Sequence, residues 1–502
     1  MATTLTSALS WWAHETPDHA ALLVADDEVT FAALDRWVTA IACDLVARGV
    51  QPGDRVGTLA GTSVAHCALL LGVIRAGAIC NALSVRLSDR EIREFYEHTQ
   101  PRWVFLGDDQ GARGAVVEAI GATARPLADI RALRDAPASA ALPVLHPDDP
   151  VGIIATSGST ARPKGVVYTH RSMLAYAAEF AVEEPFSGPG ARALALSPIA
   201  TSAGFVQLME FITLGASLRF EAVFDPERAL EILERERIYM FQGVPLFFER
   251  IAACAGFAKA DLSALKYTSV GGAPVSRALL ETWMQKGCLL RQIYGQTEAG
   301  GAISIMSKRD AAAQPSKAGR GGMFTELGVI DAEGRFLPPG TPGQIVIRGP
   351  SVMQGYWNDP ETTAKTLVDG WLRTGDLGSL DEQGYLTFID RMKDIIISGG
   401  LNISAAEVER AVAEHPGVLE VAVIGAPDAR FGETPLAIVH AKAGFAIPDL
   451  VEHCNRQLAD YKVPRYVVVE TEPLPRLATG KIAKPALRAK ILPLVPGLPR
   501  VR

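Results

Sequence analysis

The sequence predicts an α/β fold, with a large N-terminal domain that comprises α/β sheets and a small β-rich subdomain, and a small α+β C-terminal domain. Three observations carry this prediction. Helix-like and strand-like segments alternate up to about residue 330, glycine, proline and hydroxyl residues gather where several strands end, and the pattern changes after Arg391. Because a chain of 502 residues is too long for one hydrophobic core, several domains are expected.

The alternation includes residues 31–49, whose apolar spacing predicts a helix that ends at Gly49, and the buried-strand candidate DRVGTLA that follows. The strand VGIIA comes after a polar, proline-containing interval. The segments LALSPIA, YMFQGVP, KYTSVGGAP and LLRQIYGQTEAGG then repeat the pattern. Open α/β sheets bind their ligands at the carboxyl ends of such strands, so we expect a ligand site there.

Short strands such as GQIVIRG and GYLTFID, separated by turn-rich segments, predict the small β-rich subdomain over residues 325–390. After Arg391, the segment SAAEVERAVAEHPG has the spacing of a helix that begins with a capping box of Ser404 and Glu407. The strand VLEVAVIG follows this helix. Residues 394–502 therefore make up the predicted C-terminal domain.

Composition and charge argue against several classes of protein. The net charge of −7, without a basic patch, argues against a nucleic-acid partner. The six cysteines are scattered without a CxxC pair, which predicts reduced, mostly buried thiols and neither a disulfide framework nor a zinc site. The N-terminus lacks a basic region, and His66 and Arg75 interrupt the most apolar stretch. We therefore expect no signal peptide, no membrane span and a cytoplasmic location.

The segment TSGSTARPKG, residues 156–165, has the composition of a phosphate cradle. Glycine lets the backbone approach a ligand closely, hydroxyls and N–H groups hold anionic oxygens, and Lys164 supplies the neutralising charge. It is not a Walker A loop, because Pro163 replaces the second glycine and Gly165 stands where Ser or Thr would follow the lysine. Taken alone, the segment is also compatible with a polar surface loop.

Five further glycine-bearing segments follow in a fixed order: GGAP at 271–274, YGQTE at 294–298, TGD at 374–376, DRMKDIIISGG at 390–400 and LATGKI at 477–482. Together the six resemble the acyl-adenylate-forming superfamily, which includes acyl-CoA synthetases, peptide-synthetase adenylation domains and firefly luciferase. The resemblance covers nearly the whole chain. It implies an N-terminal domain over residues 1–390, a hinge at 391–393 and a mobile C-terminal domain over 394–502.

The resemblance also implies two half-reactions, in which a carboxylate and ATP give acyl-AMP and pyrophosphate, and a thiol then releases AMP. Because both first reactants are anions, their reaction requires cations and preorganised N–H donors. The residues implied as phosphate-binding are Thr156, Ser157, Gly158, Ser159, Thr160 and Lys164. Ala161 departs from the pattern, since the family usually has glycine there.

The YGQTE segment implies the rest of the nucleotide site. Glu298 is the implied magnesium ligand, since a hard cation on phosphate oxygens also takes carboxylates, and Thr297 is expected at the α-phosphate. Asp376 is expected to accept hydrogen bonds from the ribose hydroxyls, and Arg391 to donate to the ribose or the phosphate. The residues implied around the base and its backbone floor are Gly271, Gly272, Ala273, Tyr294, Gly295 and Gln296.

Lys481 is the residue expected to carry adenylation, because an ammonium can bridge the attacking carboxylate oxygen and the α-phosphate. Lys393 occupies the family's hinge position, where a change of backbone dihedral angles would swing the small domain between the half-reactions. Gly399 and Gly400 are then expected to approach the pantetheine tunnel. A surface lysine near the C-terminus is the alternative reading of Lys481.

The family's acid pocket corresponds to segments that contain neither lysine nor arginine for a second carboxylate, and no aspartate for an α-ammonium group. An apolar aryl, alicyclic or medium-chain acid is therefore expected. Thr201 departs from the family pattern, because many related CoA ligases have histidine there. The residues implied in the pocket are Thr201, Ser202, Ala203, Gly204, Phe205, Gln242, Gly243, Ala299, Gly300 and Gly301.

The thiol acceptor is expected to be free coenzyme A, since YKVPRYVVVE resembles a common CoA-ligase pattern and no carrier domain follows Lys481. Lys462 and Arg465 are candidates for the CoA phosphates, or else part of a solvated strand edge. The alternatives are a stand-alone adenylating enzyme that supplies a carrier-protein thiol or stops at acyl-AMP, a luciferase-like oxygenase, and a silent nucleotide-binding protein. If the chain assembles, a homodimer is expected.

Overall fold

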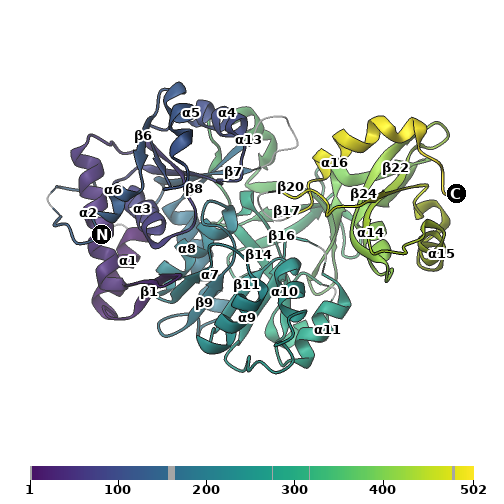
Figure 1. Cartoon of the computed structure of the whole chain (residues 1–502), viewed down its shortest axis with the longest axis horizontal. Coiled ribbons are helices and arrows are strands. Elements are labelled where there is room, and N and C mark those ends of the chain that lie inside the picture. The colour runs from purple at the N-terminus through teal and green to yellow at the C-terminus, as the bar shows by residue number, and fades with distance from the viewer. Residues whose placement is uncertain (1–2, 139, 157–163, 274, 316, 478–480) are drawn as a thin grey trace. The chain divides into compact units, whose positions relative to one another are not determined.

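The computed structural model describes residues 3–138, 140–156, 164–273, 275–315, 317–477 and 481–502 (Figure 1). Its packing defines two compact units: the first unit comprises residues 1–327 and 346–373, and the second unit residues 328–345 and 374–502. The expected hinge, 391–393, lies within the second unit, and its role stays a prediction.

The first unit contains a nine-stranded sheet in which β9 to β13 are parallel. The predicted strands in YMFQGVP and KYTSVGGAP are confirmed. In LALSPIA the strand ends at Ala195, before Pro198. The strands in spatial order are β15 (Arg320–Gly321), β14 (Gly301–Ile305), β13 (Leu290–Gln296), β12 (Tyr267–Gly271), β11 (Met240–Gly243), β9 (Arg192–Ala195), β10 (Ser217–Phe220), β1 (Ala20–Val24) and β2 (Asp27–Thr30).

Helices cover both faces of this sheet. On one face, α9 (Pro226–Arg235), α10 (Pro245–Ala252) and α11 (Arg277–Gln285) enclose a core that includes Phe241, Val270 and Trp283. On the other face lie α7 (His170–Glu183) and α8 (Ser202–Leu214), with the ring centroid of Phe180 5.1 Å from that of Tyr267. Parallel strands buried on both faces account for the continuous apolar runs in this part of the sequence.

A second, seven-stranded sheet completes the first unit and confirms the strands predicted in DRVGTLA and VGIIA. Helix α4 (Asp89–Thr99) packs on it through Ile92, Phe95 and Tyr96. The strands in spatial order are β18 (Gly355–Tyr356), β8 (Lys164–Thr169), β7 (Pro150–Thr156), β4 (Ile79–Leu83), β3 (Arg55–Leu59), β5 (Trp103–Leu106) and β6 (Thr123–Pro126). The shorter helices of this unit are α5 (Gly114–Ala119), α6 (Ala128–Arg131), α12 (Lys308–Ala311) and α13 (Pro360–Thr366).

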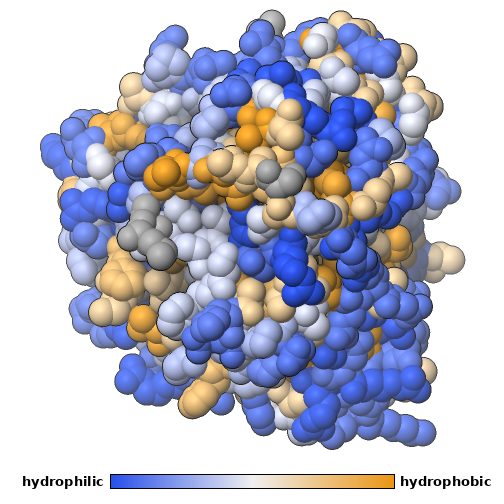
Figure 2. Space-filling view, turned by 90° about the vertical axis from the view of Figure 1, so that its left-hand side faces the viewer, coloured by the Kyte–Doolittle hydropathy of each residue, from blue (hydrophilic) through white to orange (hydrophobic). Residues whose placement is uncertain are grey.

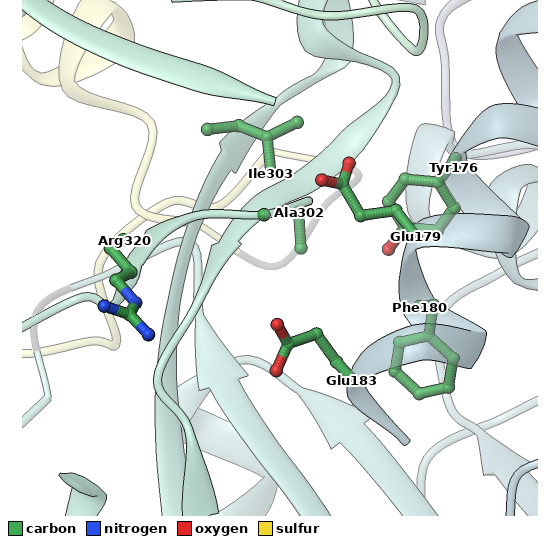
Figure 3. A pocket seen from close by; sticks show the side chains of 8 residues that line it. Tyr176, Glu179, Phe180, Glu183, Ala302, Ile303 and Arg320 are labelled. Carbon is green, nitrogen blue, oxygen red and sulfur yellow. The ribbon is translucent and has the colours of Figure 1, made fainter. Parts of the chain in front are cut away.

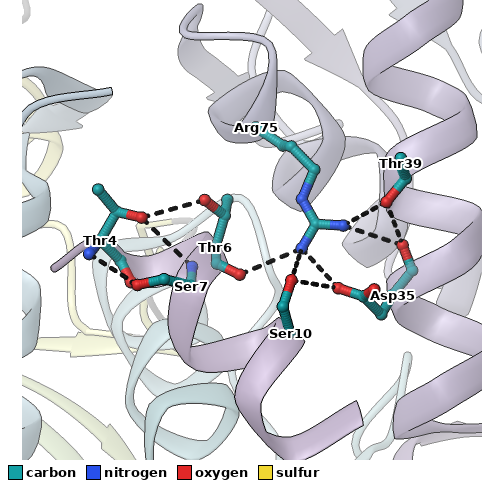
Figure 4. A network of polar contacts seen from close by, with 7 residues as sticks. All are labelled: Thr4, Thr6, Ser7, Ser10, Asp35, Thr39 and Arg75. Carbon is teal, nitrogen blue, oxygen red and sulfur yellow. Dashed lines mark hydrogen bonds and ion pairs between the residues drawn. The ribbon is translucent and has the colours of Figure 1, made fainter. Parts of the chain in front are cut away.

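Buried Arg75 ties together three N-terminal helices, α1 (Leu5–Glu15), α2 (Phe31–Ala47) and α3 (Val64–Arg75) (Figure 4). Its guanidinium pairs with Asp35 at 2.7 Å and donates to the Thr39 hydroxyl at 2.6 Å and the Thr6 carbonyl at 3.1 Å. A buried charge needs such partners. Figure 2 looks toward α1, α2 and α6; this face is mostly hydrophilic, with apolar residues gathered in its upper part.

Five strands lie near the points where the chain passes from one unit to the other, and they confirm the predictions for GQIVIRG and GYLTFID. In the first unit β19 pairs with the beginning of β20, and in the second unit the end of β20 pairs with β21. The strands are β16 (Glu326–Ile330), β17 (Gly343–Arg348), β19 (Leu367–Val368), β20 (Trp371–Leu380) and β21 (Leu386–Arg391).

The second unit also contains a five-stranded sheet. One hydrophobic cluster packs residues of α14 and α15 against the sheet, and another packs residues of α16 against it. The predicted capping box is only half formed: the Ser404 hydroxyl accepts from the Glu407 amide, but the Glu407 carboxylate binds Lys462 at 2.7 and 2.8 Å instead. The elements are β22 (Ile395–Ser398), β23 (Leu401–Ser404), α14 (Ala405–Ala413), β24 (Val418–Asp428), β25 (Gly432–Ala441), α15 (Ile447–Gln457), β26 (Tyr466–Glu470) and α16 (Lys484–Ile491).

All six cysteines are buried free thiols, as the sequence predicts. Burial raises the pKa of the Cys288 and Cys454 thiols to about 11, which keeps both protonated near neutral pH.

Across the described helices, none combines the length and apolar character that a membrane crossing requires.

Candidate active site

The YGQTE segment lies at the carboxyl end of β13, where the sequence predicts a ligand site. A single turn of 3₁₀ helix, Thr297–Ala299, follows β13 and so contains the last two residues of the segment; it ends at Gly300, whose φ of 85° favours glycine. A Cβ atom at Gly300 would lie 2.3 Å from the Ser351 carbonyl oxygen. The Met353 amide donates to the Glu298 carbonyl at 2.9 Å. The backbone of this turn is therefore fixed against residues 351–353.

The Glu298 carboxylate and the Lys164 ammonium meet through one aromatic side chain. The Tyr356 hydroxyl donates to Glu298 Oε1 at 2.9 Å, and Lys164 Nζ lies 4.8 Å from the centre of the Tyr356 ring. Burial, reinforced by the Glu298 charge, raises the pKa of Tyr356, so this phenol stays a neutral donor. The implied magnesium ligand and the implied phosphate cation thus belong to one cluster.

Thr297 is held by a second phenol. The Tyr168 hydroxyl donates to the Thr297 carbonyl at 2.7 Å and lies 3.1 Å from the Ser202 hydroxyl. Burial raises the pKa of Tyr168, so it too remains a neutral donor. The turn expected at the α-phosphate is thereby joined to the start of α8, which is expected in the acid pocket.

The candidate phosphate cradle begins at the end of one strand and ends at the start of the next, and these two strands are antiparallel. Thr156 ends β7 and lies opposite Lys164, which begins β8. Ser157, Gly158, Ser159 and Thr160 lie outside the described residues.

The expected adenine floor lies at the ends of β12 and β13. A Cβ atom at Gly271 would lie 2.5 Å from the Ile293 carbonyl oxygen, and one at Gly295 would lie 2.0 Å from the Gly301 carbonyl oxygen. Gly272 has a φ of 78°, and Ala273 is exposed. Tyr294 is buried, and the buried Gln296 Nε2 lacks a hydrogen-bond partner among the described residues. Close backbone packing therefore requires at least two of these glycines.

Helix α8 positions the first group of acid-pocket residues. Thr201 is its N-cap: the hydroxyl accepts from the Gly204 amide at 3.2 Å and donates to the Pro198 carbonyl at 2.7 Å. A Cβ atom at Gly204 would lie 2.2 Å from that carbonyl oxygen. Phe205 is fully buried, with its ring 2.9 Å from the position of a Cβ atom on Gly152. The residue that stands in place of the family histidine thus stabilises a helix end.

The second group of acid-pocket residues lies on the neighbouring strands. Gln242 and Gly243 end β11, and a Cβ atom at Gly243 would lie 2.9 Å from the Phe247 ring. Gly301 has a φ of 135°, and a Cβ atom there would lie 2.8 Å from the Tyr176 ring. A side chain at position 243 would thus meet α10, and one at position 301 would meet α7.

Three residues expected at the nucleotide, Asp376, Arg391 and Lys481, lie in the second unit together with the expected hinge residue Lys393. Asp376 and Arg391 face each other across β20 and β21, with Nε 3.8 Å from Oδ1. Burial and the positive charge of Arg391 lower the pKa of Lys481, while Asp376 opposes the shift. Burial and the positive charge of Arg391 also lower the pKa of Lys393. This cluster of cations has the electrostatics of an anion site.

Gly399 and Gly400 have φ values of 58° and 82°, in the left-handed region that favours glycine. The Gly399 amide donates to the Phe431 carbonyl at 2.8 Å. These two residues therefore form a tight turn, and their expected place beside a pantetheine chain stays a prediction.

Sequence reasoning did not find Tyr168 and Tyr356. Neither lies in one of the six recognised segments, and a single tyrosine carries no motif that separates a site residue from a core residue. The glycine before Tyr356, with a φ of 155°, is the available signal for a special backbone position there.

A small cavity between α7 and β14 contributes little to a substrate site (Figure 3). Its volume of ≈ 20 Å³ has room for one water molecule. Figure 3 shows Glu179 and Glu183 reaching from α7 toward β14 and Arg320. The Glu179 carboxylate accepts from the amides of Phe324 and Thr325, so it fixes that loop.

Comparison with known proteins identifies the class. The chain matches the AMP-binding enzyme family over residues 9–357 and the AMP-binding enzyme C-terminal domain over residues 407–481. It therefore belongs to the AMP-binding enzymes, in the acyl-CoA synthetase branch of the adenylate-forming superfamily. The chain is an AMP-forming ligase of the acid–thiol class.

Three similar proteins illustrate this branch. A feruloyl-CoA synthase from Amycolatopsis sp is 36% identical over 92% of this chain and 94% of its own length. A fatty acid–[acyl-carrier-protein] ligase, ScoC, from Streptomyces coeruleorubidus is 34% identical over 97% and 96%. The structure of o-succinylbenzoate coenzyme A synthetase (MenE) from Bacillus subtilis, in complex with ATP and magnesium ion, has a TM-score of 0.87 and 27% identity, covering 96% and 99%.

Proposed function

We propose that this protein is an ATP-dependent acyl-CoA ligase that activates an apolar carboxylic acid as acyl-AMP and transfers the acyl group to coenzyme A, releasing AMP. The cluster of Lys164, Tyr356 and Glu298 carries this proposal. It places a cation and a carboxylate beside the turn at the carboxyl end of β13, where an α/β sheet binds its ligand.

Lys164 and the hydroxyls of the TSGSTARPKG segment bind the β- and γ-phosphates in this proposal. Glu298 holds Mg²⁺, which neutralises phosphate charge when bound. A single carboxylate suits this role, because magnesium in nucleotide sites takes one or two carboxylates together with phosphate oxygens.

The second unit supplies the groups for adenylation. Asp376 accepts hydrogen bonds from the ribose hydroxyls, and Arg391 donates to the ribose or the phosphate. Lys481 bridges the attacking carboxylate oxygen and the α-phosphate, so that it offsets the charge that builds up as the new bond forms. Lys393 is the hinge residue, about which the C-terminal domain 394–502 moves before the thiol attacks.

The proposal also names the thiol acceptor, the cellular location and the oligomeric state. Coenzyme A is the acceptor that the similarity to feruloyl-CoA synthase supports, while the similarity to ScoC supports a carrier-protein thiol as the second candidate. Lys462 is already bound by Glu407, which weakens its candidacy as a CoA phosphate ligand. We place the enzyme in the cytoplasm and, if it assembles, as a homodimer.

The test is pyrophosphate release with ATP and magnesium across a panel of aryl, alicyclic, fatty and dicarboxylic acids, each with and without coenzyme A, with products followed by mass. Acid-dependent pyrophosphate together with acyl-CoA is expected. Acyl-AMP without a thioester points to the carrier-protein alternative, and ATP binding without pyrophosphate for any acid contradicts the ligase.

A further inference from the structure

Residues 498–502 lie beyond both regions that match the family, yet they are packed into the second unit. The Leu498 side chain packs against the hydrophobic cluster that includes residues of α16. The Val501 side chain packs against the cluster that includes residues of α14 and α15. The family match therefore gives no reason for these residues, although they contact two separate parts of the unit.

Two polar contacts join this segment to the YKVPR segment, residues 461–465. The Arg502 guanidinium pairs with Asp460 at 2.7 Å. The Val501 amide donates to the Arg465 carbonyl at 2.9 Å. Asp460 comes directly before YKVPR and Arg465 ends it, so both ends of this segment are held.

Arg500 binds a buried carboxylate, that of Asp428. The Asp428 side chain is 0% exposed, and its Oδ2 atom accepts from the Arg500 guanidinium. Its Oδ1 atom accepts from the amides of Arg430 and Phe431 at 2.8 and 3.0 Å. Because a buried carboxylate needs a paired cation as well as such donors, Arg500 stabilises the whole turn from Asp428 to Phe431.

Phe431 connects this turn to two arginines and to the Gly399 turn. Its carbonyl accepts from the Gly399 amide at 2.8 Å, and a Cβ atom at Gly399 would lie 3.2 Å from its ring. The guanidinium carbons of Arg430 and Arg465 lie 5.0 and 4.5 Å from the centre of the ring. Arg430 is exposed and Arg465 is half-buried. Two accessible cations thus depend on one aromatic side chain for their position.

The surface around this turn suits a thiol carrier with an uncharged arm and a phosphorylated end. Ile397 and Leu401, on the two strands that the Gly399 turn connects, are 57% and 47% exposed, and they offer apolar contacts to the arm. Coenzyme A has such an arm, pantetheine, and it also carries phosphates. Arginine suits phosphate oxygens, because its fork of donors matches their geometry.

We propose that residues 498–502 position Arg430 and Arg465 to bind the phosphates of coenzyme A during thioester formation. Arg500 is a positioning residue, because it acts through the Asp428 turn and does not itself contact the acceptor. This inference rests on the proposed function with coenzyme A as the thiol. It concerns the second half-reaction alone, since acyl-AMP forms before the thiol attacks.

The test compares coenzyme A with pantetheine, which has the same thiol arm but no phosphate, using kcat/KM for thioester formation from supplied acyl-AMP. The wild type is expected to prefer coenzyme A, and Arg500→Met should reduce this preference by about tenfold. The rates with pantetheine and of acyl-AMP formation should change by less than about threefold. Arg500→Lys, which keeps a cation, should lose less of the preference than Arg500→Met.

Arg456→Met is the matched control, because Arg456 is an exposed arginine of the same unit that pairs with Glu452 at 2.9 Å. It should leave the preference unchanged. If Arg500→Met does not fold, Arg502→Met tests the same preference and should reduce it by about threefold. Equal losses with both acceptors and in acyl-AMP formation would show a purely structural role of Arg500 and contradict the proposal.

A wild-type preference near one, or a preference that neither Arg500→Met nor Arg502→Met alters, overturns the positioning role. In that case thioester formation by the wild type still supports the ligase. Acyl-AMP without a thioester to either thiol overturns coenzyme A as the acceptor and the positioning role together.

Discussion

The two units hold their expected nucleotide residues in different ways. In the first unit, Glu298 is fixed by the Tyr356 hydroxyl and by its own backbone, so its position is set by hydrogen bonds before any ligand binds. In the second unit, Lys393 and Lys481 lie near Arg391 with lowered pKa values. The first arrangement positions groups, whereas the second accumulates positive charge that an anionic reactant would relieve.

Lys481→Ala is expected to have the largest effect on this comparison. Removing a cation that acts on developing charge should slow acyl-AMP formation by on the order of a hundred- to a thousand-fold. Thioester formation from supplied acyl-AMP should stay largely intact, because the charge it offsets belongs to the first half-reaction. Stopped assays of pyrophosphate and thioester measure the two rates separately.

Lys490→Ala is the control for this experiment. Lys490 is an exposed lysine that pairs with Glu470, and its loss should leave both rates unchanged. Equal losses in both half-reactions of Lys481→Ala would contradict the assignment of Lys481 to adenylation.

Tyr356→Phe tests the fixed arrangement of the first unit. The substitution removes the donor to the Glu298 carboxylate but keeps the ring under Lys164. A hydrogen bond to a charged group contributes about 1.5 to 3 kcal/mol, so the apparent affinity for magnesium–ATP should fall by roughly ten- to a hundred-fold. Titration of magnesium at fixed ATP measures this shift, and Tyr356→Leu, which also removes the ring, should weaken ATP binding further.

The lowered pKa of Lys481, in the second unit, predicts how the rate of acyl-AMP formation depends on pH. An ammonium is lost as the pH rises through its pKa, so acyl-AMP formation should decline at a lower alkaline pH than the ordinary lysine value of 10.5 implies. Arg391→Met removes the positive charge that, after burial, lowers the pKa of Lys481. The decline should therefore move to higher pH by less than about one unit. Lys481→Arg should remove the decline, since arginine stays charged. A decline at the same pH in all three proteins would assign it to another group.

Lys462→Met is expected to have the smallest effect. The ammonium of Lys462 is already bound by both Glu407 oxygens, so the KM for coenzyme A should change by less than about threefold. Steady-state kinetics with coenzyme A as the varied substrate checks this, and an increase of tenfold or more would restore Lys462 as a phosphate ligand.

Much of this fold could be predicted because its signals are local. The helix α2, which ends at Ala47 just before Gly49, and the strand in VGIIA follow directly from apolar spacing and glycine. The capping box failed because Glu407 found a partner 55 residues away, Lys462, which a local motif does not report. Tyr356 was missed for the same reason, since its partner Glu298 is 58 residues distant.

By itself the sequence determined the class of enzyme, because six segments in a fixed order carry the groups that adenylation chemistry requires. It also predicts the roles of Lys164, Glu298 and Lys481, which the experiments above test. Only the tertiary structure showed that the Tyr356 phenol joins Lys164 to Glu298, and that the Tyr168 phenol joins the Thr297 carbonyl to Ser202. The physical reason is that hydrogen bonding and burial depend on which distant segments pack together, and a carboxyl's pKa depends on that burial.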